Sequence, residues 1–123
     1  MITQLVRASV LAAVCIAAFA TESPARSPYD GAWSVLIVTT RGECDRAYRY
    51  GISIINGHIR YDGGMVAMTG RVFPNGSVRV SLTTGNASAS GSGRLSRNSG
   101  SGDWSGMSGP SRCSGYWEAS RSG

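Results

Sequence analysis

The sequence contains no lysine, so arginine supplies all twelve of its long basic side chains. Seven carboxylates oppose them, and the full chain carries a formal net charge of +5. Guanidinium groups pair well with carboxylates and phosphates, so an anionic partner is one explanation of this composition. Ordinary solubilising surface charge is the other.

Histidine is nearly absent as well, because His58 is the only one. A metal centre or a Ser-His-Asp triad needs further ligands or an ordered set of partners around a histidine. Haem ligation by His58 or by Met65, Met68 or Met107 would need a pocket that the pattern does not indicate. The sequence therefore predicts no metal and no cofactor.

Paired carboxylates with a catalytic spacing are also missing. Glu43 and Asp45 flank Cys44 with Arg41 and Arg46 close by, which is typical of a solvated, charge-balanced loop. The remaining acids are scattered along the chain. We therefore predict that the protein is not an enzyme and has no catalytic residue.

A helical pattern is lacking from Trp33 onward, since no useful run of apolar residues recurs at three and four positions. Short alternating runs appear every 8–12 residues instead, separated by turn signals such as Asn56-Gly57 and Pro74-Asn75-Gly76. The predicted strands are Ala32–Thr40, Ala47–Ile55, His58–Tyr61, Met65–Phe73, Ser77–Thr83, Ala87–Leu95, Ser101–Met107 and Arg112–Ser120. This pattern predicts an all-β fold: an eight-stranded antiparallel up-and-down meander closed into a small barrel, which removes exposed edges.

Long apolar runs are absent except near the start, at Ala8–Phe19. That run is too short for a membrane span and precedes Ala18-Phe19-Ala20, a small-x-small cleavage pattern. We therefore expect residues 1–20 to be a signal peptide, 21–30 a flexible arm and 31–121 a single β-barrel domain. The mature protein would be secreted or periplasmic, monomeric and without a membrane span.

Two cysteines remain after such cleavage, Cys44 and Cys113. In a closed meander of eight strands, the end of the first strand and the start of the last share one rim, and these cysteines fall there. Export supplies an oxidising compartment, so the sequence predicts one disulfide between them.

Three Gly-x-Trp units stand at the first strand and the last two, with Trp33, Trp104 and Trp117. A glycine beside an indole lets another ring or backbone approach closely, so the units indicate one aromatic core. The interior of the sixth and seventh strands is otherwise small, with Ala87, Ala89, Gly91, Gly93, Gly102 and Gly106. This leaves room for a thin ligand or serves to accommodate the tryptophans, and the rarity of voids in native interiors favours the second.

An arginine stripe is predicted on the outside of the sheet, formed by Arg49, Arg60, Arg79 and Arg94. It is the candidate surface for an anionic polymer, an anionic surface or a protein. Nucleic-acid binding is not expected, because the tyrosines that would stack on bases have inward parity: Tyr48, Tyr50 and Tyr61.

Gly31-Ala32-Trp33 at the first strand of a small exported meander resembles the opening motif of the calycins, which include lipocalins, avidins and bacterial metalloprotease inhibitors. The resemblance implies that Trp33 packs against Arg121 at the end of the last strand. The remaining lipocalin motifs are absent. The chain also looks like small secreted proteins of rhizobial bacteria, through Cys44–Tyr48 and Cys113–Trp117 among other stretches, and that likeness implies no specific activity.

Together these observations predict an exported, non-catalytic binding or interaction module, such as a protein inhibitor or a surface-interaction protein. The alternative is a lipocalin-like barrel that binds a small ligand, haem among the possibilities.

Overall fold

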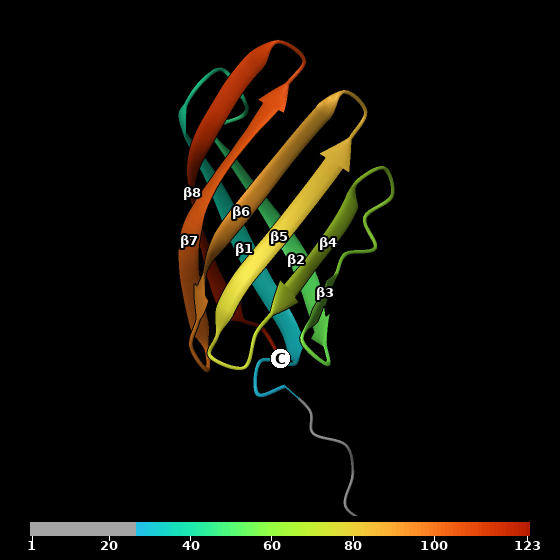
Figure 1. The fold of residues 1–123 in the computed structure, drawn as a ribbon, viewed down its shortest axis with the longest axis vertical. Coiled ribbons are helices and arrows are strands. Elements are labelled where there is room, and N and C mark those ends of the chain that lie inside the picture. Colours follow the sequence, from blue (N-terminus) through green and yellow to red (C-terminus); the bar gives the residue numbers. More distant parts are fainter. Residues whose placement is uncertain (1–26) are drawn as a thin grey trace, which may run out of the picture.

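The computed structural model describes residues 27–123, and eight antiparallel strands close into a barrel in which each strand pairs with its neighbours in the sequence (Figure 1). The strands are β1 (Gly31–Arg41), β2 (Ala47–Ile55), β3 (His58–Arg60), β4 (Ala67–Val72), β5 (Ser77–Thr84), β6 (Ala87–Leu95), β7 (Ser99–Ser108) and β8 (Ser111–Arg121). The predicted all-β meander of eight strands is confirmed. The predicted signal peptide lies outside the described residues.

The region around β3 departs from the predicted bounds. β3 ends at Arg60 and β4 begins at Ala67, so these two strands pair at only two positions. In the segment between β3 and β4, Gly64 has a φ of 59° and Met65 is 87% exposed. The chain therefore leaves the sheet between these two strands. The barrel wall is therefore shortest between β2 and β4.

The last strand closes the barrel against the first. β1 and β8 pair from Trp33 opposite Arg121 as far as Arg41 opposite Ser114. Beyond this pairing, Cys44 and Cys113 form a disulfide with their Cα atoms 6.1 Å apart. The predicted disulfide, and with it the shared rim, is confirmed.

One end of the barrel is packed shut. Trp33 and Ile54 are only 1% and 2% exposed and lie at the centre of a buried cluster that includes Trp117. Arg121 covers this end from outside, with its guanidinium carbon 4.7 Å from the centroid of the Trp33 ring. The guanidinium nitrogens of Arg121 each donate to a backbone carbonyl oxygen, and the bond to Asp30 measures 2.6 Å.

Residues 27–30 take part in this closure. The Asp30 carboxylate accepts the backbone N–H groups of Asn56 and Gly57, at 2.7 and 3.1 Å, in the turn between β2 and β3. Tyr29 packs against the core cluster, and its carbonyl oxygen accepts the Trp33 indole N–H. The predicted flexible arm therefore does not extend over residues 27–30, because their polar groups are bound to the barrel.

No helix in residues 27–123 is long and apolar enough to cross a membrane.

Candidate functional site: a cavity in the open half of the barrel

The half of the barrel opposite the packed end encloses a cavity of about 350 Å³. Its floor is the top of the buried core, including Trp33 and Ile54. Its mouth lies among the β1–β2 loop, the β5–β6 turn and the end of β7, where Tyr48 is 40% exposed and Met107 is 39% exposed. The rise in exposure from floor to mouth shows that the cavity opens at one end only.

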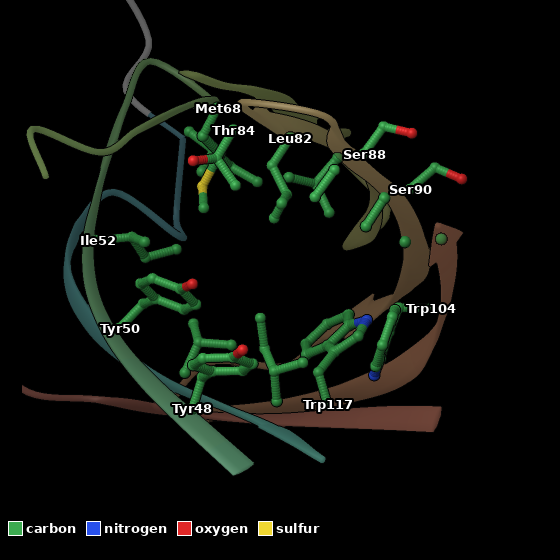
Figure 2. Close-up of a pocket in the computed structure, with 18 of the residues that line it drawn as sticks. Tyr48, Tyr50, Ile52, Met68, Leu82, Thr84, Ser88, Ser90, Trp104 and Trp117 are labelled. Carbon is green, nitrogen blue, oxygen red and sulfur yellow. The ribbon is translucent and has the colours of Figure 1, made fainter. Parts of the chain in front are cut away.

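The lining is mostly apolar. Alternating residues of β2, β4 and β5 supply Ile52, Met68 and Leu82, while Ala89 and Gly91 of β6 keep the facing wall thin. Figure 2 shows Ile52, Met68 and Leu82 arranged around an empty centre, with the hydroxyls of Ser88 and Ser90 directed away from it. Strand alternation therefore places the polar atoms of β6 outside and leaves its smallest groups inside.

The two tryptophans on the wall lie flat instead of filling the interior. The indole N–H of Trp104 donates to the carbonyl oxygen of Val38 at 3.0 Å, and that of Trp117 donates to Ser92 at 3.2 Å. Each ring from β7 or β8 thus crosses the neighbouring strand to reach the next one. A satisfied indole N–H can be held against the wall without contacting water.

Glycines make this arrangement possible, because each of the two tryptophans lies opposite a glycine of the neighbouring strand. The hairpin register pairs Gly102 with Trp117 and Trp104 with Gly115. A β-carbon added to Gly102 would lie 2.6 Å from the Trp117 ring, and one added to Gly115 would lie 3.0 Å from the Trp104 indole nitrogen. Both readings of the small interior residues hold in part: the glycines accommodate tryptophans, and a cavity remains. The favoured expectation of a filled interior is wrong for the open half.

The three tryptophans contribute to one hydrophobic cluster, which forms where β1 meets β8 and extends along the wall. Trp33 and Trp117 are buried in the main cluster, and Trp104 is partly buried against it. The stacking of Arg121 on Trp33 agrees with the role that the calycin resemblance implies for these two residues.

Tyrosines border the mouth. The Tyr48 and Tyr50 rings stack with centroids 6.1 Å apart, and Tyr61 meets Tyr50 edge-on at 5.2 Å. Burial, followed by the Asp45 carboxylate, raises the pKa of Tyr48. Burial and then Tyr61 raise the pKa of Tyr50. Both phenols therefore stay protonated at neutral pH and can donate hydrogen bonds.

The arginines on the outer wall are arranged differently from the prediction. Arg71 and Arg79 are directly opposed across β4 and β5, and Arg94 lies diagonally from Arg79 on β6. Arg49 stands apart beside β1, opposite Leu36, where it donates to the Ser34 hydroxyl. We define the basic face as Arg60, Arg71, Arg79 and Arg94. The sequence pattern did not assign Arg71 to either face of its strand. The β4–β5 register places it on the same face of the sheet as Arg79.

His58 lies exposed on the outer side of β3, opposite Arg71. In residues 27–123, no three histidine, cysteine, aspartate or glutamate side chains come together as a metal site would require. The small residues of β6 and β7 had indicated room for a ligand, but only the placement of the indoles distinguishes a hollow interior from a filled one.

Comparisons with models of known protein families, with curated proteins and with solved structures each found no match for this chain.

Proposed function

We propose that the protein binds a small, largely apolar molecule inside the open half of the barrel. The observation that carries this proposal is the cavity of about 350 Å³, open at one end and closed by a packed core at the other. Ligand sites in proteins occupy roughly 300–1,000 Å³ and are lined mainly by apolar and aromatic side chains with a few polar groups. A cavity of about 150 Å³ already binds benzene, so this one suits a molecule of two or three aromatic rings or a medium alkyl chain.

Two further features support the proposal. The eight-stranded closed barrel with Arg121 on Trp33 is in keeping with the calycin resemblance, and lipocalins of that group hold one small ligand inside such a barrel. The disulfide is compatible with a protein that works outside the cytoplasm, as the predicted export requires.

The proposal predicts that filling the cavity abolishes binding. Ala89 points inward from β6, and we expect Ala89→Trp to occupy the space of one ring of a bound ligand. Losing the burial of one ring should weaken binding of the neutral probe N-phenyl-1-naphthylamine by roughly thirtyfold or more. Energy transfer from Trp104 and Trp117 to the probe measures the affinity.

Ser92→Trp is the matched control, because it adds the same side chain to the outer face of the same strand. It should leave probe affinity unchanged, and thermal unfolding should show both variants folded. Equal loss of binding in the two variants, or equal retention, would place the probe outside the cavity and contradict the proposal.

A second candidate function concerns the basic face, which we propose as a contact for an anionic polymer or surface. The Arg71–Arg79 pair supports it, since like charges directly opposed across two strands repel. A polyanion bound to this face would relieve that repulsion. Solubility alone does not require Arg71 and Arg79 to be directly opposed.

The basic face predicts a position-dependent response to charge removal. Arg71→Gln with Arg79→Gln should weaken binding to a heparin or sulfated-dextran matrix by roughly twofold to thirtyfold, the range expected for two exposed charges. Arg49→Gln with Arg112→Gln removes the same charge away from this face and should have the smaller effect. Identical elution profiles of the two double variants would show that only net charge matters.

A further inference from the structure

The charge of the cavity lining is opposite to that of the protein. Although the full chain has a net charge of +5, no arginine in residues 27–123 lines the cavity. The only charged side chains there are Glu43 and Asp45, at the mouth. Any ligand that fills the cavity and reaches its mouth therefore meets carboxylates and no cationic side chain among the lining residues.

The loop that carries these carboxylates is held in place from both sides. Cys44, between them, is bonded to Cys113 on β8, and its backbone N–H points to the Cys113 sulfur at 3.2 Å. Thr39, 4% exposed, donates its hydroxyl to the Asp45 carbonyl oxygen at 2.6 Å and its N–H to the Arg46 carbonyl oxygen at 2.9 Å. The disulfide and Thr39 thus fix the acidic loop over the cavity mouth.

Two aromatic rings line the same cavity as this loop. Figure 2 shows the Tyr48 and Tyr50 rings on the cavity wall with their hydroxyls directed inward. Asp45 and Tyr48 line the same cavity, and the Asp45 carboxylate contributes, after burial, to the raised pKa of the Tyr48 phenol. Ring faces attract organic cations, and adjacent carboxylates strengthen the attraction.

We infer that the ligand is a cationic amphiphile, with a protonated amine or quaternary ammonium head between the acidic loop and the tyrosines and an apolar tail on the cavity floor. The inference rests on the proposed function, since it names the chemical class of the ligand for the same cavity. The carboxylates alone would not define a site; their position over an apolar cavity does. An anionic amphiphile would set its head group beside Glu43 and Asp45, and neither Arg41 nor Arg46, which flank this loop, lines the cavity.

Three compounds with one tail test the inference: decyltrimethylammonium, 1-decanol and decanoate, titrated calorimetrically below their aggregation limits. We expect the ammonium compound to bind about fivefold more tightly than the alcohol, in line with one exposed cation–π contact and one exposed charge pair, and decanoate to bind most weakly. Higher salt should weaken only the ammonium compound's advantage.

The outcomes separate the two proposals. Decanol or decanoate binding as tightly as the ammonium compound would overturn the inference on charge while leaving the proposed cavity function intact. Failure of all three compounds to bind, and to displace N-phenyl-1-naphthylamine, would overturn both.

Neutralising the loop gives an independent test. Glu43→Gln with Asp45→Asn should reduce the ammonium affinity about fivefold, to that of decanol, and leave decanol unaffected. Asp103→Asn with Glu118→Gln is the matched control, because these carboxylates are exposed on the outer wall of β7 and β8. An equal loss in both double variants would mean that net charge, and not the mouth, selects the ligand.

Discussion

Gly102→Ala should destabilise the folded barrel by about 2–6 kcal/mol, the sum expected for a forced core overlap and a buried indole N–H that loses its acceptor. The added β-carbon would overlap the Ser92 carbonyl oxygen and lie 2.6 Å from the Trp117 ring. That carbonyl is also the acceptor of the Trp117 indole N–H. Denaturant unfolding followed by tryptophan fluorescence measures the change.

Gly51→Ala is the control, since a β-carbon at this position in β2 meets no atom within 4 Å. It should leave stability unchanged or raise it by about 0.4–1 kcal/mol through the unfolded state. Equal destabilisation by both substitutions would show that the cost comes from strand propensity, and the account of Gly102 as a seat for Trp117 would be wrong.

Removing the disulfide, with Cys44→Ser and Cys113→Ser together, should lower the free energy of unfolding by about 2–5 kcal/mol. The bridge spans 69 residues, for which the loop-entropy relation gives roughly 4 kcal/mol. We expect the variant to fold, because β1 and β8 still pair from Trp33 to Arg41. Chemical denaturation of the oxidised protein and the double serine variant provides the comparison.

Amide hydrogen exchange shows which part of the barrel loses stability when the disulfide is removed. Amide hydrogens at the mouth end of β1 and β8, around Thr39 and Ser114, should lose protection before those near Trp33. Uniform loss along both strands would contradict a rim-specific role. Free thiols in the protein purified under oxidising conditions would contradict the disulfide itself.

Much of the architecture could be predicted because it depends on local signals. Alternating residues and tight turns specify strands and hairpins, and eight such strands leave one economical way of removing the edges. Even the reciprocal seating of Trp104 on Gly115 and Trp117 on Gly102 was contained in the chain, because these residues lie symmetrically about the Gly109-Pro110 turn.

The candidate site was harder to predict because it depends on side-chain direction across strands. Small residues on β6 and β7 allowed either a hollow or a filled interior, and the rarity of voids in native interiors favoured the filled one. The hydrogen bonds of Trp104 to Val38 and of Trp117 to Ser92 hold the rings against the wall, and so decide for the hollow one. These acceptors lie far from the indoles in sequence, so no local signal marks them.

By itself, then, the sequence determined the strand order, the closure and the disulfide, since each follows from alternation, turns or the meeting of the two chain ends. The Trp33–Arg121 contact was implied by the calycin resemblance alone. Only the tertiary structure decided that the interior is open at one end, that Arg71 replaces Arg49 on the basic face, and that Asp30 ties the predicted arm to the turn at Asn56. The physical reason is common to all three. Each depends on which atoms are in contact across strands. Register, twist and side-chain rotamers together determine those contacts, and no local sequence pattern encodes them.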